Sequence, residues 1–150
     1  MLEVGSVLPD FTTVNQEGVS VSSKNFIGKK LIIFFYPKAS TPTCTVEVCN
    51  LRDYFQDLVK EGFELVGVSA DSEKRQKNFH TKNNLPFDLL ADESASIAKL
   101  FGVWKEKKNF GKTYMGIVRT TFVFDEKGTL VRRIDKVQSK AAAQQILEVN

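Results

Sequence analysis

The chain has two cysteines, Cys44 and Cys49, and both lie in the stretch PKASTPTCTVEVC at residues 37–49. A thiol can act as a nucleophile, a redox group or a metal ligand. Structural zinc sites take about four Cys or His ligands, whereas this chain adds a single histidine, His80, far along a polar segment. We therefore interpret His80 as a surface residue and expect no zinc site.

An apolar stripe at helical spacing predicts a helix over about residues 43–60. Its members are Val48, Leu51, Phe55 and Leu58. Cys44 falls on this stripe at its N-terminal end, and Cys49 falls about 140° around the helix, on the polar side. Cys44 alone has an ordinary interpretation as a small buried apolar residue, but a free thiol on a solvated face is chemically exposed and harder to explain.

The spacing of the two thiols limits how they can react with each other. In an intact helix, five residues separate the Cα atoms of Cys44 and Cys49 by roughly 8–9 Å. A disulfide needs Cα atoms within about 7 Å and converging Cβ atoms. The spacing therefore predicts an element that is helical when the thiols are reduced and locally unfolded when they are bonded.

The residues before Cys44 predict that the helix begins there. Thr41 is a candidate hydroxyl cap, and a following proline favours the first turn. A thiol in a first turn lies near unpaired backbone N–H groups and the positive end of the helix dipole, which both favour a thiolate. Glu47, one turn further on, opposes this effect unless a cation pairs with it, and the neighbouring sequence does not show which cation does so.

Strands and helices alternate along the rest of the chain. The apolar runs KLIIFFYP (30–37) and FELVGVSAD (63–71) are typical of strands buried on both faces. We also predict a hairpin over 11–23, a polar helix over about 72–82, a short strand over 87–92 and a helical face at Ile97, Leu100 and Phe101. Towards the end of the chain we predict a hairpin over 119–135, with its turn at Glu126 to Gly128, and a closing helix over 139–149 capped by Ser139. This order predicts one α/β domain over residues 1–150. We expect a thioredoxin-like fold, with a mixed central β-sheet flanked by helices and an N-terminal β-hairpin extension.

Composition argues against several kinds of partner. The formal net charge is +3, and clusters such as KEKK at 105–108 are too short for a nucleic-acid footprint, so we interpret them as solvated surface. The N-terminus lacks the pattern of a signal peptide, and the longest apolar run, LIIFFY, is too short to span a bilayer. We expect a cytoplasmic protein without nucleic-acid or membrane partners.

Several motifs resemble one known family. PKASTPTCTVE resembles the P-x-x-x-T-x-x-C motif of the peroxiredoxins through Pro37, Thr41 and Cys44, with Glu47 at the family's usual acidic position. GIVRTTFVFDEKG resembles the strand that carries the family's essential arginine, here Arg119. A second cysteine five residues after the first marks the bacterioferritin comigratory protein, or PrxQ, subfamily. The likeness extends over essentially the whole chain, through GSVLPDFTTVNQEG, GVSADS and LPFDLLAD.

The resemblance implies a thiol-dependent peroxidase that reduces hydrogen peroxide and organic hydroperoxides in antioxidant defence. Cys44 would be the peroxidatic cysteine, which becomes a sulfenic acid, and Cys49 the resolving cysteine, which condenses with it to an intramolecular disulfide. Thioredoxin or a similar dithiol would reduce that disulfide by exchange. No cofactor would be needed, because the thiolate does the chemistry. The subfamily likeness also implies a monomer.

The resemblance assigns supporting roles as well. Thr41 would hold the peroxide and the thiolate through its hydroxyl, and Pro37 would shield the site from water. Arg119 would stabilise the thiolate and the charge developing on oxygen, with Glu47 orienting the guanidinium. Taken singly, these residues have ordinary interpretations as a helix cap, a strand terminator and a surface ion pair.

Two positions depart from many relatives, which carry Asp and Gly where this chain has Ala39 and Thr43. Thr43 places a β-branched side chain next to the thiol, where Gly would leave the loop freer. The width of the pocket, the ease of local unfolding and the preferred peroxide therefore stay open.

Two other classes of protein are alternatives. A thioredoxin-like dithiol oxidoreductase is disfavoured, because the chain has no CxxC and no proline precedes the TTFVF strand. A redox sensor without turnover would differ from a peroxidase in failing to consume peroxide repeatedly with a thioredoxin system present.

Overall fold

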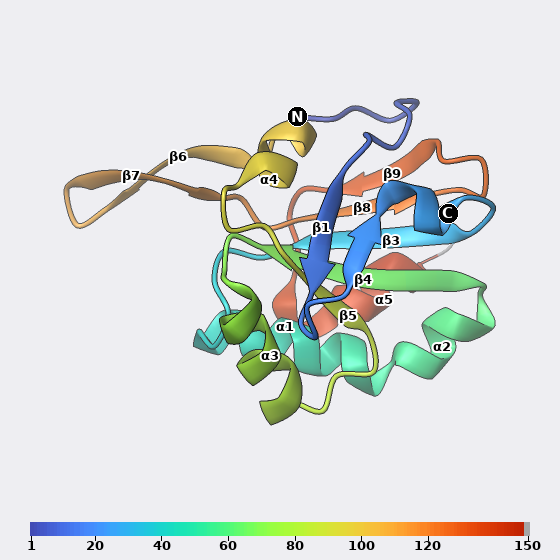
Figure 1. The fold of residues 1–150 in the computed structure, drawn as a ribbon, viewed down its shortest axis with the longest axis horizontal. Coiled ribbons are helices and arrows are strands. Elements are labelled where there is room, and N and C mark those ends of the chain that lie inside the picture. The colour runs from blue at the N-terminus through green and yellow to red at the C-terminus, as the bar shows by residue number, and fades with distance from the viewer. Residues whose placement is uncertain (149–150) are drawn as a thin grey trace.

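A seven-stranded mixed sheet runs through the computed structural model, which describes residues 1–148, and a separate two-stranded arm projects from it (Figure 1). The strand order is β2-β1-β5-β4-β3-β8-β9. The strands of the sheet are β1 (Thr12–Asn15), β2 (Ser20–Ser22), β3 (Lys30–Phe35), β4 (Phe63–Ser69), β5 (Asp88–Ala91), β8 (Thr120–Phe124) and β9 (Leu130–Ile134), and those of the arm are β6 (Trp104–Asn109) and β7 (Lys112–Ile117). The helices are α1 (Pro42–Asp53), α2 (Phe55–Lys60), α3 (Glu73–Lys82), α4 (Ser96–Phe101) and α5 (Ala142–Leu147), with 3-10 turns η1 (Ser23–Phe26) and η2 (Ser139–Ala141).

The central strand β3 divides the core into two layers. β3 pairs in parallel with β4 and antiparallel with β8, and alternate residues along it point to opposite faces. Leu31, Ile33 and Phe35 join the cluster under α4 and the N-terminal segment. Ile32 and Phe34 join the cluster under α1, α2, α3 and α5, the helices on the other side of the sheet in Figure 1. The continuous apolar run of β3 thus reflects burial on both faces, as predicted.

The predicted fold class is confirmed in its main features. The sheet is mixed and flanked by helices, both predicted hairpins form as β1–β2 and β8–β9, and the short strand and helix between them form as β5 and α4. The N-terminal hairpin is part of the main sheet, because β1 pairs with β5. None of the helices within residues 1–148 has the length and apolar character needed to cross a membrane.

The predicted helix over residues 43–60 is two helices. α1 begins at Pro42, and the backbone leaves helical geometry at Tyr54, with φ −105° and ψ 12°, before α2 begins. The apolar stripe nevertheless continues across the break, since Val48, Leu51 and Leu58 are all buried. Hydrophobic spacing could not reveal the break, because one non-helical residue barely disturbs it.

The predicted closing helix is wrong at its start. Residues 139–141 form the 3-10 turn η2, whose first residue, Ser139, caps nothing, and the α-helix begins only at Ala142. The side chain of Gln145 reaches back and accepts the N–H of Gln138, the residue before the turn, at 2.9 Å. Residue 149 of the predicted helix lies outside the described residues.

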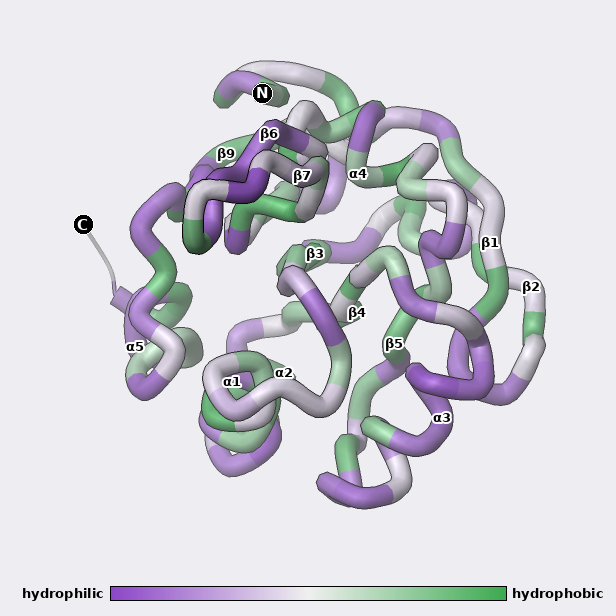
Figure 2. Tube along the Cα trace, turned by 90° about the vertical axis from the view of Figure 1, so that its left-hand side faces the viewer, coloured by the Kyte–Doolittle hydropathy of each residue, from purple (hydrophilic) through white to green (hydrophobic). Residues whose placement is uncertain are grey.

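The β6–β7 arm was missed by the sequence analysis, which interpreted residues 105–108 only as charged surface. The two strands pair antiparallel from Trp104 opposite Ile117 to Asn109 opposite Lys112. Phe110 and Gly111 connect them with φ of 51° and 76°, the positive values that a tight two-residue hairpin turn requires. Figure 2 shows much of this arm as hydrophilic, so it lacks the alternating apolar pattern by which a strand is recognised.

Candidate active site

The loop between β3 and α1 places Cys44 in the first turn of a helix. Pro42 is the first helical residue, and the N–H of Thr45 donates to the carbonyl oxygen of Thr41 at 2.9 Å to start the helical ladder. Before the helix, Ser40 takes a left-handed conformation with φ 65°, and the N–H of Ala39 donates to Asp71 Oδ2 at 2.8 Å. The loop is therefore fixed to the end of β4 rather than free.

Arg119 meets the thiol of Cys44. Cys44 is only 1% exposed, and its Sγ lies 3.2 Å from Nη2 of Arg119. Sheet pairing explains the meeting, because Thr120 of β8 lies opposite Phe35 of β3, and the loop to α1 leaves β3 just after that point. A guanidinium beside a sulfur stabilises its thiolate by charge.

Glu47 is the carboxylate partner of the same guanidinium. Its side chain is fully buried, Oε1 accepts from Nη1 of Arg119, and among the described residues Oε2 has no hydrogen-bond partner. Burial raises the pKa of Glu47 to about 7, although the charge of Arg119 pulls it down. Burial lowers the pKa of Arg119, but the charges of Glu47 and Cys44 outweigh it and leave that pKa raised. Arg119 is thus the cation that Glu47 needs as a partner in its position near the thiol.

Thr41 and Pro37 belong to the same loop, and within the described residues neither side chain makes a hydrogen bond to Cys44, Glu47 or Arg119. The Thr41 hydroxyl donates to the carbonyl oxygen of Lys38 at 2.8 Å, and within the described part of the chain none of its hydrogen bonds reaches Cys44. Thr41 stands at the cap position of α1, but its side chain makes no capping bond, so that expectation was wrong. Pro37 follows β3 and is half-buried. The roles predicted for Thr41 and Pro37 stay predictions.

Cys49 lies further along the same helix as a free, half-buried thiol. α1 is unbroken from Cys44 to Cys49, so the two thiols are held apart as the spacing predicted. The Sγ of Cys49 lies 3.6 Å from Oδ1 of Asn83 at the end of α3.

A buried polar network under the loop was not found from the sequence. The Tyr36 hydroxyl donates to Gln76 Oε1, Gln76 Nε2 donates to Ser69 Oγ at 2.8 Å, and Ser69 Oγ donates to Asp71 Oδ2 at 2.7 Å. Asp71 in turn accepts the N–H of Ala39. Burial raises the pKa of Tyr36, so its hydroxyl stays protonated and acts as a donor. The polar end of the apolar FELVGVSAD strand was the one sequence signal for this network.

Lys107 brings a second cation toward the site from the arm. Its half-buried ammonium is affected by the charges of both Arg119 and Cys44, and burial, with Arg119, lowers its pKa. The stem of Lys107 crosses Gly116 so closely that a Cβ there would lie 3.3 Å from Lys107 Cδ. Lys107 was not predicted as a site residue, because the hairpin that carries it was not predicted.

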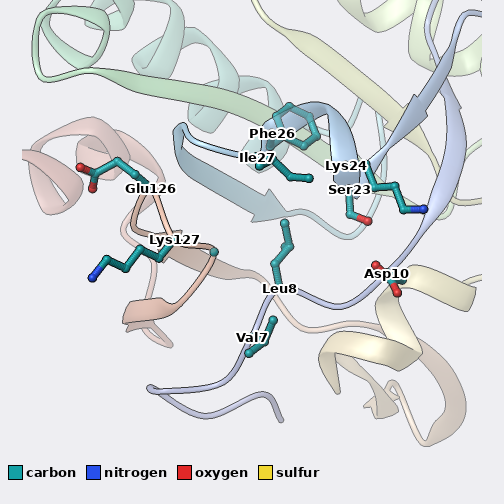
Figure 3. A pocket seen from close by; sticks show the side chains of 10 residues that line it. Val7, Leu8, Asp10, Ser23, Lys24, Phe26, Ile27, Glu126 and Lys127 are labelled. Carbon is teal, nitrogen blue, oxygen red and sulfur yellow. The ribbon is translucent and has the colours of Figure 1, made fainter.

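A separate hollow lies away from both cysteines. Figure 3 shows Leu8 pointing toward Phe26 and Ile27 there, with Lys24 and Asp10 near its edge. Its volume is about 160 Å³ and its surface is mainly apolar. It contains none of the chemistry-bearing residues predicted from the sequence.

Comparison with known proteins defines the class of this chain. The model of the AhpC/TSA family matches residues 4–133, which is most of the chain. The chain therefore belongs to the AhpC/TSA family.

The relatives narrow this class to the bacterioferritin comigratory protein, or PrxQ, peroxiredoxins. Peroxiredoxin Bcp of Bacillus subtilis is 42% identical over 139 residues, covering 93% of this chain and 88% of its own. Peroxiredoxin Bcp of Escherichia coli is 40% identical over 134 residues, covering 89% and 86%. A solved structure of the Xanthomonas campestris bacterioferritin comigratory protein has a TM-score of 0.89 at 32% identity, covering 97% and 95%. The chain is thus a thiol-dependent peroxidase with the predicted thioredoxin-like fold.

Proposed function

We propose that this peroxiredoxin reduces hydrogen peroxide and organic hydroperoxides with Cys44 as the attacking thiolate and Cys49 as the resolving thiol. The observation that carries the proposal is the guanidinium of Arg119, which lies 3.2 Å from Cys44 Sγ while it is held by the buried Glu47. One cation is thus positioned both for a thiolate and for the oxygen that develops charge beside it.

The chemistry needs only groups that this chain and a peroxide supply. The Cys44 thiolate attacks one peroxide oxygen, the O–O bond breaks, and the sulfur becomes a sulfenic acid. The other oxygen leaves as an alkoxide or hydroxide, which Arg119 stabilises until it takes a proton. Cys49 then condenses with the sulfenic acid, which forms a disulfide and releases water. A dithiol such as thioredoxin returns two electrons by exchange.

Organic hydroperoxides are included for two reasons. The Xanthomonas campestris relative is described with alkyl peroxide reduction activity. In this chain, a mainly apolar hollow of about 440 Å³ lies beside the first turn of α1, lined by Pro42, Thr43 and Val46 and by residues 138–140. Cys44 itself does not line this hollow, but the apolar surface belongs to the same helical turn and suits the carbon end of such a substrate.

The test is peroxide consumption coupled to thioredoxin and its reductase. We expect Cys44→Ser to consume no peroxide. Cys49→Ser should still be oxidised by one equivalent of peroxide but should fail to turn over with thioredoxin. Full turnover by Cys44→Ser would overturn the assignment, and a single oxidation without turnover in the wild type would indicate a sensor.

We further propose that the protein acts as a monomer in the cytoplasm. The likeness to its subfamily supports the monomer, and two free cysteines without a disulfide framework suit a reducing compartment. Light scattering of the reduced and oxidised protein tests the first statement, and fractionation of the source cell tests the second.

A further inference from the structure

Cys49 is held by contacts with a residue outside its own helix, α1. Cys49 Sγ lies 3.6 Å from Oδ1 of Asn83, the residue that ends α3. Arg52, one turn further along α1 than Cys49, donates from Nη1 to the carbonyl oxygen of the same Asn83 at 2.9 Å. Two side chains of α1 therefore converge on one residue of another helix.

Asn83 is a fixed point rather than a mobile surface residue. It is 8% exposed, and its Nδ2 donates to the carbonyl oxygen of Phe79 at 2.9 Å. Phe79 itself is fully buried in the core between α3 and the sheet. The side-chain amide is thereby oriented so that its oxygen faces the thiol of Cys49.

These contacts oppose the movement that resolution requires. Cys44 and Cys49 lie on different sides of one unbroken helix, so the helix must open between them and the thiol of Cys49 must leave its place beside Asn83 before a disulfide can form. When it leaves, its contact with Asn83 is lost. The bond from Arg52 is charge-assisted and is therefore the stronger of the two contacts.

We propose that Arg52 and Asn83 form a latch that holds Cys49 in the folded helix and sets the rate at which the sulfenic acid of Cys44 is resolved. The latch rests on the proposed function, since it takes Cys44 and Cys49 as the reacting pair. Arg52 and Asn83 are positioning residues, because Asn83 contacts Cys49, Arg52 contacts Asn83, and neither makes a hydrogen bond to Cys44 within the described residues.

The latch also sets how readily the enzyme is overoxidised. The sulfenic acid of Cys44 has two competing reactions. Condensation with the Cys49 thiol gives a disulfide and water, whereas attack on a second hydroperoxide gives a sulfinic acid and an alcohol or water. A latch that delays Cys49 prolongs the life of the sulfenic acid and so favours the second reaction.

The test compares wild type with Arg52→Gln and Asn83→Ala. Reduced protein is mixed with one equivalent of peroxide, quenched with acid at set times, and assayed for disulfide by mass spectrometry. We expect disulfide to form about three- to tenfold faster in Arg52→Gln, the range that corresponds to losing one partly exposed, charge-assisted hydrogen bond. Asn83→Ala keeps the backbone carbonyl that Arg52 binds and loses the contact with Cys49, so we expect a smaller acceleration from it. The peroxide concentration that gives half-maximal sulfinic acid should rise by a similar factor, while the rate of the first oxidation of Cys44 stays unchanged.

Arg133→Gln is a matched control on β9. Arg133 also donates to a backbone oxygen, that of Leu2 at 2.8 Å, and pairs with an acid nearby in sequence, Asp135. Its side chain is 27% exposed, against 33% for Arg52. We expect wild-type rates of disulfide formation from this variant.

Several outcomes would contradict the latch. Disulfide formation at the wild-type rate in Arg52→Gln overturns it, and so does equal acceleration by Arg52→Gln and Arg133→Gln, which would indicate a general loss of stability. Urea unfolding identifies any variant that does not fold, and Arg52→Lys, which keeps the charge but loses the guanidinium geometry, then takes its place with a smaller acceleration expected. If the wild type forms no disulfide between Cys44 and Cys49, the proposed function itself fails.

Discussion

At the scale of single residues, Glu47 has the most unusual surroundings. Its carboxyl group is fully buried, one oxygen is paired with Arg119, and the other has no partner among residues 1–148. The result is a pKa near 7, so the charge that holds Arg119 changes over the physiological range. Protonation of Glu47 is therefore expected to lower the activity and to raise the stability.

The first prediction concerns the rate of Cys44 oxidation. A neutral Glu47 loses its charge interaction with Arg119, so the second-order rate constant with peroxide should fall as pH drops through about 7. Glu47→Gln should be slower at neutral pH and should lack this component of the profile. Stopped-flow measurements across about pH 5 to 9 test this expectation, and an unchanged profile in the variant would contradict it.

The second prediction concerns stability. The pKa of Glu47 is raised from its ordinary 4.5 to about 7 in the folded state, so the folded protein binds this proton more tightly than the unfolded chain does. The stabilisation is complete below pH 4.5 and is lost as pH rises through about 7. Relative to Glu47→Gln, the wild type should lose up to about 3 kcal/mol of unfolding free energy over this range. Urea unfolding at both ends of the range measures the difference, and parallel curves would exclude the effect.

At the scale of elements, the β6–β7 arm supplies a charge that no core element provides. Lys107 lies between exposed neighbours on β6, yet it is half-buried, because its stem lies over Gly116 on β7. The charges of Arg119 and Cys44 both act on it. The arm therefore adds to the positive potential that favours a thiolate and attracts anions.

The third prediction tests this contribution. Lys107→Gln should slow the oxidation of Cys44 about two- to fivefold at low ionic strength, with a smaller effect at high salt, where charges are screened. Lys105→Gln, on the same strand but exposed, is the matched control and should have little effect. Gly116→Ala should have a smaller effect than Lys107→Gln, because the added methyl group only shifts the lysine stem slightly and leaves its charge in place. Equal rates for Lys105→Gln and Lys107→Gln would contradict the role of the arm.

How far the site could be predicted depends on where each part of it comes from. Cys44 and Glu47 were singled out from residue types and spacing around the helix start, whereas Arg119 was assigned only through the family resemblance of its strand. Asn83 and Lys107 carry no such pattern, because only the packing of α3 and the register of the arm bring them near the cysteines.

The prediction for Thr41 shows the limit of the same reasoning. Its position at the start of α1 followed from Pro42, but the direction of its hydroxyl depends on the turn made by the loop, where Ser40 is left-handed. Polar side chains can satisfy several nearby backbone groups, and the sequence does not choose among them.

At the scale of the whole molecule, the two core layers have different roles, one in supporting the cysteines and one in stability. The layer under α1, α2, α3 and α5 includes Cys44 and Phe79, and so supports both cysteines. The layer under α4 is rich in aromatic rings and includes neither cysteine. Phe101 is its centre, with its ring within 6.5 Å of those of Phe11, Phe35, Phe122 and Phe124.

The fourth prediction separates stability from chemistry on this basis. Phe101→Ala should lower the free energy of unfolding by about 3–5 kcal/mol, because a large, fully buried side chain leaves a cavity. Under conditions where the variant stays folded, its rate of Cys44 oxidation should remain close to that of the wild type. Urea unfolding and stopped-flow kinetics on the same sample measure both quantities. A large loss of rate in the folded variant would show that the two layers are coupled.

The fold itself was predictable where the burial of an element produces a recognisable apolar pattern in the sequence. β3 and β4 were recognised because both of their faces are covered, and the β8–β9 hairpin because turn residues separate two apolar runs. The break at Tyr54 and the short turn before α5 were not, because they depend on local backbone geometry that single residues do not specify.

The position of β8 in the sheet affects the protein while it is still being synthesised. β8 lies between β3 and β9, and Arg119 directly precedes it. A nascent chain that has emerged only as far as Val118 already carries both thiols and the residues of the loop, but it has neither the guanidinium nor the strand that positions it. The ribosome-bound chain therefore holds a thiol without its guanidinium, and Arg119 can reach Cys44 only after β8 has been made.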